Sequence, residues 1–145
     1  MNYNDLETIS ILDYFDYPLS ELLKDPINNQ LYLSVITGET LRVVKYLVLP
    51  TTFHELRNYI KKGMVLKDIF IRKTVFITDE NMDFQELHIS QEKAEELFTG
   101  KAELYWLIAY SEEEETKEIA LKCLDEMEKK FNGMEYDESC VWESC

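Results

Sequence analysis

The sequence predicts a single α+β domain in which an antiparallel sheet packs against two to four helices, with a long amphipathic helix near the C-terminus. Three observations predict this class. Residues 8–50 are rich in β-branched and aromatic side chains, the hydrophobic spacing becomes helical after Pro50, and an apolar stripe recurs between residues 119 and 131. With 145 residues, 46% of them hydrophobic, the chain has enough apolar material for one core.

The first third of the chain predicts strands. Residues 30–37 and 41–49 are β-branched and aromatic runs separated by a short link around Gly38, which predicts a hairpin. Turn-forming residues at 25–29 separate this hairpin from residues 19–24, which we therefore expect to form a third antiparallel strand. A short helix starting near Pro18 is the alternative.

A capping box marks the first helix. Thr52 and Glu55 have the required spacing, because a threonine oxygen can accept from the third amide while the glutamate reaches back. Apolar residues then recur at helical spacing until Gly63, a residue that commonly ends helices. The sequence therefore predicts a helix over residues 52–62.

The middle of the chain predicts short elements. Residues 65–70 fit a second helix, and residues 74–78 and 84–89 read as a pair of strands. Ser90 is expected to begin a charged helix that ends near Phe98. Residues 103–110 form an apolar run whose length favours a strand, although its periodicity does not exclude a helix.

The C-terminal part predicts an amphipathic helix from Ser111 to about Gly133. Four glutamates stand where carboxylates complement a helix N-terminus. The expected apolar stripe comprises Ile119, Cys123, Leu124, Met127 and Phe131. We assign residues 1–133 to the domain and residues 134–145 to an acidic C-terminal tail, either ordered or flexible.

Three runs in the first half of the chain resemble a family of small, functionally uncharacterised bacterial and phage-associated proteins. The runs are Asp13-Tyr14-Phe15-Asp16-Tyr17-Pro18-Leu19-Ser20, Tyr46-Leu47-Val48-Leu49-Pro50-Thr51 and Lys67-Asp68-Ile69-Phe70. The resemblance implies a compact α+β fold. It supplies no catalytic residue.

The net charge of the chain favours some classes of binding partner over others. The chain has 29 Asp and Glu against 15 Lys and Arg, a net charge of −14. This excess repels phosphate backbones and anionic lipids, so we expect a basic protein partner rather than direct binding to nucleic acid or a membrane. An acidic surface that serves only solubility is the alternative.

The first residues and the cysteines indicate the cellular compartment of the protein. The first residues carry neither the basic region nor the apolar run of a secretory signal, so we expect a cytoplasmic protein. Three cysteines in the last quarter do not describe a disulfide framework, so reduced thiols are expected.

Residue types that enzymes favour are scarce. Two histidines and three C-terminal cysteines have no zinc-site spacing, and the four glycines are isolated rather than gathered into a phosphate-binding loop. We therefore predict no catalytic residue, metal or cofactor. Carboxylates are the exception, and Asp13 with Asp16, or Asp79 with Glu80 and Asp83, are the pairs that a metal-dependent hydrolase could use.

Aromatic and acidic residues occur together at both ends of the chain. Tyrosine and tryptophan supply strong interface contacts, while carboxylates steer a basic partner. The alternatives are a core role for the first cluster, a frayed tail for the last, and an ordinary solvated face for the charged helix. The hypothesised partner-binding residues are Asp13, Tyr14, Asp16, Tyr17, Glu112, Glu113, Glu114, Glu115, Glu118, Asp125, Glu126, Glu128, Tyr136 and Trp142.

These observations favour a non-enzymatic acidic protein that binds and blocks a basic protein, as an immunity protein, an antitoxin or a phage counter-defence inhibitor does. One alternative is a structural or adaptor domain that self-assembles, for example as a homodimer, through the apolar residues near Trp106 and Ile119. The other is a carboxylate-based, metal-dependent hydrolase.

Overall fold

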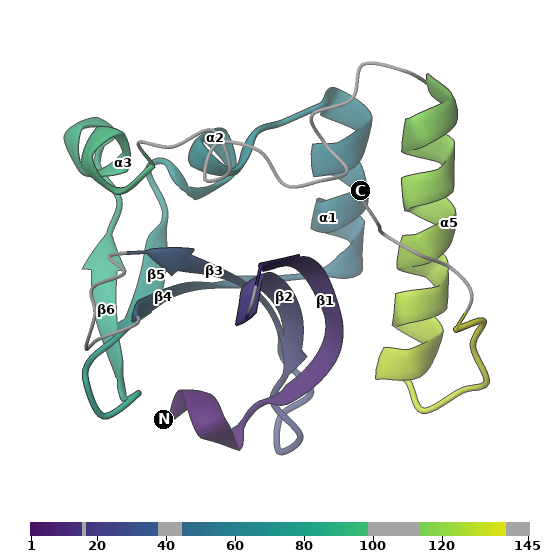
Figure 1. Cartoon of the computed structure of the whole chain (residues 1–145), viewed down its shortest axis with the longest axis horizontal. Coiled ribbons are helices and arrows are strands. Elements are labelled where there is room, and N and C mark those ends of the chain that lie inside the picture. Colours follow the sequence, from purple (N-terminus) through teal and green to yellow (C-terminus); the bar gives the residue numbers. More distant parts are fainter. Residues whose placement is uncertain (16, 38–44, 99–113, 139–145) are drawn as a thin grey trace.

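The computed structural model describes residues 1–15, 17–37, 45–98 and 114–138. Within these ranges it contains a six-stranded sheet and four α-helices (Figure 1). The strands are β1 (Glu7–Phe15), β2 (Tyr17–Lys24), β3 (Leu31–Thr37), β4 (Lys45–Thr51), β5 (Thr74–Thr78) and β6 (Phe84–His88). The helices are α1 (Phe53–Lys62), α2 (Leu66–Phe70), α3 (Gln91–Leu97) and α5 (Glu114–Phe131), and a 3-10 helix, η1 (Tyr3–Asp5), precedes β1.

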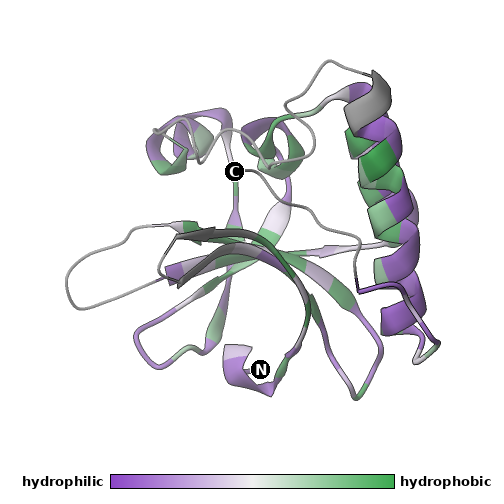
Figure 2. Cartoon of the chain, turned by 45° about the vertical axis from the view of Figure 1, so that its right-hand side comes forward, coloured by the Kyte–Doolittle hydropathy of each residue, from purple (hydrophilic) through white to green (hydrophobic). Residues whose placement is uncertain are grey.

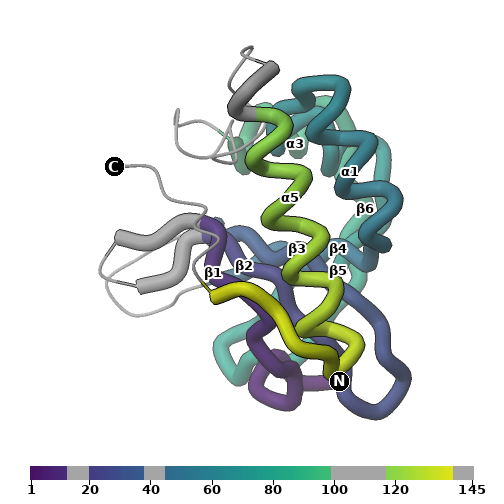
Figure 3. The backbone as a smooth tube through the Cα atoms, turned by 90° about the vertical axis from the view of Figure 1, so that its right-hand side faces the viewer, coloured from purple at the N-terminus to yellow at the C-terminus, as the bar shows by residue number. Residues whose placement is uncertain are grey.

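Every strand of the sheet pairs antiparallel with the next strand in the chain, in the order β1-β2-β3-β4-β5-β6. The helices lie on one face of this curved sheet, and η1 lies on the other (Figure 1). α5 runs alongside α1 and approaches β1 (Figure 3). The predicted fold class, a single α+β domain with an antiparallel sheet and a long C-terminal helix, is confirmed.

The main core fills the space between the sheet and the helices. Leu33 and Leu47 from the sheet, Ile60 from α1, Phe70 from α2 and Leu124 from α5 are fully buried in it. Figure 2 shows hydrophobic and hydrophilic residues alternating along the strands and around α5, as expected for elements with one buried face. The apolar periodicity of the sequence therefore decides which side of each element faces the core.

The predicted α1 is confirmed at both ends. The Thr52 hydroxyl accepts a hydrogen bond from the Glu55 amide at 3.1 Å. Gly63 ends the helix in the left-handed region, with φ 64°, a conformation that glycine adopts without a steric penalty. The second hydrogen bond of a capping box would join the Glu55 carboxylate to the Thr52 amide. Here a Glu55 carboxylate oxygen accepts instead from the Tyr59 hydroxyl at 3.1 Å.

Most of the other predicted elements are confirmed. The segment after Pro18 is a strand, so the alternative of a helix there is wrong. α2, β5, β6 and α3 form where the sequence predicts them, and the Ser90 hydroxyl caps α3 by accepting from the Lys93 amide. The link around Gly38 and the run over residues 103–110 lie outside the described residues.

One residue of the α5 stripe was predicted wrongly. Ile119 is 52% exposed, whereas Ala120 is buried with Cys123, Leu124 and Met127. Each helical residue advances by about 100°, so position 119 falls roughly 90° from the centre of the stripe, while position 120 falls near it. Ile119 fits the spacing to Cys123 but lies at the margin of the face that packs against α1 and β1.

A second, smaller cluster covers the opposite face of the sheet. Leu23, Tyr32 and Val48 are buried there, and the Tyr3 ring stacks on Tyr46 with centroids 4.6 Å apart. The Tyr3 hydroxyl reaches the buried side chains of Glu21 and Ser34, each at 3.0 Å. η1 is therefore attached to the sheet by aromatic stacking and by a buried polar network.

Candidate interaction site

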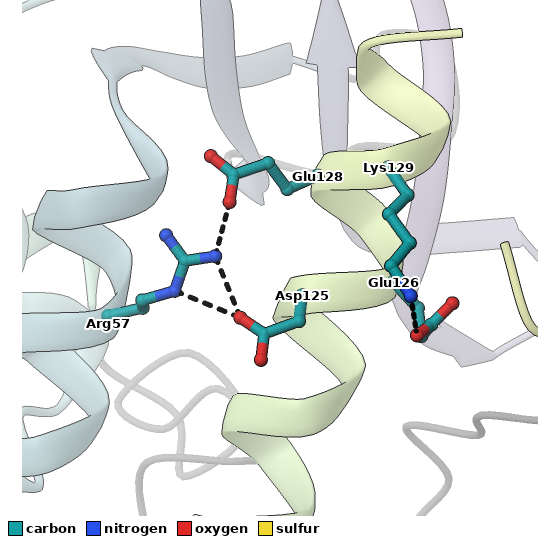
Figure 4. Close-up of polar contacts among 5 residues, drawn as sticks. All are labelled: Arg57, Asp125, Glu126, Glu128 and Lys129. Carbon is teal, nitrogen blue, oxygen red and sulfur yellow. Dashed lines mark hydrogen bonds and ion pairs between the residues drawn. The ribbon is translucent and has the colours of Figure 1, made fainter. Parts of the chain in front are cut away.

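An arginine joins α1 to α5 (Figure 4). Arg57 Nη2 lies 2.8 Å from Asp125 Oδ1 and also contacts Glu128 Oε1, and Arg57 Nε donates to the same Asp125 oxygen at 3.3 Å. Asp125 and Glu128 were predicted to face a partner. In the structure both form ion pairs with a cation of this chain, which offsets part of the negative charge on this side of α5.

Replacing Arg57 with methionine tests this link. We expect the free energy of unfolding to fall by about 1 kcal/mol, because the aliphatic stem is kept while two partly exposed ion pairs are lost. Urea unfolding at low and high salt measures the effect. Since salt screens such pairs, the difference from wild type should shrink in high salt, and a difference that salt does not change would contradict the electrostatic role.

The tail returns from the end of α5 toward β1 (Figure 3). Gly133, with φ 73°, turns the chain, and the Met134 amide donates to the Lys129 carbonyl. Glu126 then holds the tail, because one of its oxygens accepts from the Asp137 amide at 2.6 Å while the other binds Lys129 at 2.7 Å. The Lys129 ammonium holds the pKa of the Glu126 carboxyl below its usual value.

A groove of about 370 Å³ lies between β1, α5 and this part of the tail. Ile9, Cys123 and Met127 are the buried residues of its lining, and Ile11, 43% exposed, belongs to the rim. The other residues of the lining are Thr8 and Ser10 from β1, and Glu126, Lys130, Tyr136, Asp137 and Glu138 from α5 and the tail. The arrangement, an apolar floor beside carboxylates and a tyrosine, suits a partner that offers both an apolar and a basic side chain.

Tyr136 is fixed within this lining. Its ring lies 5.5 Å from the Lys130 ammonium, and its hydroxyl donates to Glu138 Oε1 at 3.2 Å. Tyr136 as a whole is nevertheless 38% exposed. The hypothesised tail residue Tyr136 and the helix residue Glu126 therefore meet in one groove.

Cys123, in the floor of the groove, corrects another expectation. It is disulfide-bonded, so the prediction of reduced thiols is wrong at this position. Cys140 and Cys145 lie outside the described residues. No local pattern in the sequence indicates this bond, because cysteine spacing alone does not reveal pairing.

The other hypothesised residues are only partly placed. Glu118 is exposed on α5, and the backbone puts Glu114 and Glu115 in the first turn of that helix. Asp13 and Tyr14 belong to β1 and Tyr17 to β2, at the hairpin where Phe15 is paired with Tyr17. Their side chains, and the whole of Asp16, Glu112, Glu113 and Trp142, lie outside what the structure describes.

The carboxylates of the β5–β6 turn have structural contacts. Asp79 Oδ1 accepts from the amides of Asn81 and Asp83 at 2.8 and 3.0 Å, and Asp83 Oδ1 accepts from the Asn2 side chain at 3.0 Å. Within the described part of the chain, no group of three or more histidine, cysteine or acidic residues is placed to hold a metal ion. In the same part, no helix is long and apolar enough to cross a membrane.

One charge pattern was missed in the sequence. Arg72 and Lys73 directly precede β5, and Asp79 and Glu80 directly follow it. Antiparallel β6 returns alongside, so this hairpin has a basic end and an acidic end. Comparing the charge on the two sides of each predicted strand would have revealed the pattern.

Comparison of the chain with family models, curated proteins and solved structures gives no match. The groove and the charged surfaces must therefore be interpreted from their own geometry and chemistry.

Proposed function

We propose that this protein is a non-enzymatic acidic binding protein that blocks a basic protein partner, in the manner of an immunity protein, an antitoxin or a phage counter-defence inhibitor. The observation that carries the proposal is the groove between β1 and α5, where Tyr136 and Glu138 stand beside the apolar floor. A chain with a net charge of −14 attracts a basic surface over a longer range than the contact itself.

The groove supplies both parts of a protein interface. The exposed side chain of Ile11 provides apolar area that a partner can bury, and the partly exposed Tyr136 is a typical strong contact. Glu138 lies at the same place and is exposed, so a lysine or arginine of the partner can pair with it. Occupying the basic surface would prevent that surface from reaching its own anionic target.

A pair of groove variants tests the proposal. We expect Tyr136→Ala and Glu138→Lys each to weaken capture of the partner by about tenfold or more, because each removes a central contact. Glu92→Lys is the matched control, since Glu92 is exposed on α3, away from the groove, and the charge change equals that of Glu138→Lys. Equal losses in Glu138→Lys and Glu92→Lys, with no loss in Tyr136→Ala, would show that only net charge matters and would contradict a site in the groove.

We further propose a cytoplasmic location. The disulfide at Cys123 provides the check, because disulfides persist in oxidising compartments and are rare in the cytosol. Because Cys123 is buried, cells are quenched with acid and their thiols are alkylated in denaturant, which should label Cys123 if the proposal is right. Complete protection of Cys123 from labelling would place the protein in an oxidising compartment instead.

A further inference from the structure

The two edges of the sheet differ in how well they can accept another strand. The register between β1 and β2 shifts at three points, and such bulges discourage pairing with a further strand. β6 pairs with β5 over all five of its residues without a shift. Among the described residues, the outer side of β6 meets only the N-terminal segment, through a single bridge between Asn2 and Asp83.

Hydrogen bonds reveal which backbone groups of β6 point outward. The Ile89 amide donates to the Lys73 carbonyl, toward β5, whereas the Phe84 amide donates to the Met1 carbonyl on the outer side. Successive residues of a strand alternate in direction, so the amides of Glu86 and His88 also point outward. Both residues are exposed, and neither is covered by the N-terminal segment.

We propose that β6 pairs antiparallel with β6 of a second copy, with Glu86 of each copy opposite His88 of the other. A two-fold axis relates the copies, so this register forms two such pairs. One neighbouring register places Glu86 opposite Glu86, where like charges are unfavourable, and the other places His88 opposite His88, where neither ring meets a carboxylate. The side chains of the edge therefore select one alignment.

The position of the His88 ring agrees with this pairing. Its Nδ1 atom lies 3.5 Å from Thr74 Oγ1 on the neighbouring strand β5. The other ring nitrogen, Nε2, has no hydrogen bond among the described residues. A proton on Nε2 can be donated to a Glu86 carboxylate of the second copy.

The charged ends of the hairpin supply a second match. Antiparallel pairing brings the turn of one copy, with Asp79, Glu80 and Asp83, toward the end of the other copy where Arg72 and Lys73 lie. Arg72 and Glu80 are exposed and belong to none of the ion pairs of the described residues. Arg72 therefore offers complementary charge to the turn of the other copy at each end of the interface, whereas Lys73 already donates to the Tyr59 hydroxyl of its own chain.

Analytical ultracentrifugation of the full chain over a range of concentrations tests the proposal. We expect a reversible dimer for the wild type. His88→Glu places carboxylates opposite one another in both pairs and should raise the dissociation constant about tenfold. The double variant Glu86→His/His88→Glu exchanges the two groups and should restore the dimer, a rescue that excludes misfolding as the cause of the loss.

The other histidine provides a matched control. His54 is exposed on α1, so His54→Glu makes the same change of charge away from β6 and should leave the dimer intact. A wild type that stays monomeric at its highest soluble concentration would overturn the proposal. A dimer that His88→Glu leaves unchanged would overturn it as well. Because the groove lies at the opposite edge of the sheet, either result leaves the proposed binding function standing.

Discussion

Replacing Phe70 with alanine is expected to lower the free energy of unfolding by about 3–5 kcal/mol, the usual cost of truncating a fully buried phenylalanine. Phe70 has no exposed surface, and its ring lies 5.6 Å from that of Phe98. α2 has only five residues, so its attachment depends on Phe70 and the two other buried side chains, Leu66 and Ile69. A large cavity would remain, because the surrounding sheet and helices cannot collapse fully into it.

Urea unfolding followed by circular dichroism measures this loss. Asp68→Ala is the matched control, because Asp68 is exposed on the same helix and should change stability by less than about 0.5 kcal/mol. A loss below about 1 kcal/mol for Phe70→Ala would show that α2 is not part of the core as described.

The second large effect concerns the network beneath η1. Tyr3→Phe keeps the ring stacked on Tyr46 but removes the hydroxyl that contacts Glu21 and Ser34. We expect a loss of about 1–3 kcal/mol, because two buried polar side chains are then left without this partner. Tyr3→Ala also removes the stacking and should cost more. An equal stability of Tyr3→Phe and wild type would contradict the network.

Glu21→Gln tests the same network through pH. Burial raises the pKa of the Glu21 carboxyl above its ordinary value of 4.5, and the hydrogen bond from Tyr3 offsets this only in part. The folded protein therefore binds this proton more tightly than the unfolded chain does. The protonated Glu21 carboxyl therefore contributes to the free energy of unfolding. This contribution is fully present below pH 4.5 and is lost as pH rises through the folded-state pKa.

Glutamine does not ionise, so Glu21→Gln does not lose stability at this position as pH rises. We expect the stability of Glu21→Gln relative to wild type to be greater at pH 7 than at pH 4, as measured by thermal unfolding at both values. A difference between the two proteins that does not change with pH would show that Glu21 titrates alike in the folded and unfolded states.

Local signals account for the elements that the sequence predicted well. The Thr52 cap and Gly63 define α1 because both act within one helical turn. The turn residues at 25–29 separate β2 from β3, and β-branched residues define β3 and β5, for the same reason. Ile119 was misassigned because the centre of the α5 stripe depends on what the helix packs against, and residue spacing alone does not contain that information.

The candidate site was predicted only in part, because its contacts join distant residues. Local composition predicts Tyr136 and Glu126 as contact residues for a partner, and both line the groove. Arg57 contacts Asp125 and Glu128 across 68 and 71 positions of sequence, so no local pattern indicates that these carboxylates are already paired. The wall that β1 contributes to the groove was missed for the same physical reason.

Affinity capture of the tagged protein from its native host, with and without nuclease and over a series of salt concentrations, tests the proposed function most directly. The proposal predicts one basic protein, identified by mass spectrometry, that is recovered in stoichiometric amount, survives nuclease and dissociates as salt rises. Recovery of the tagged protein alone, or of a partner that nuclease removes, would contradict it.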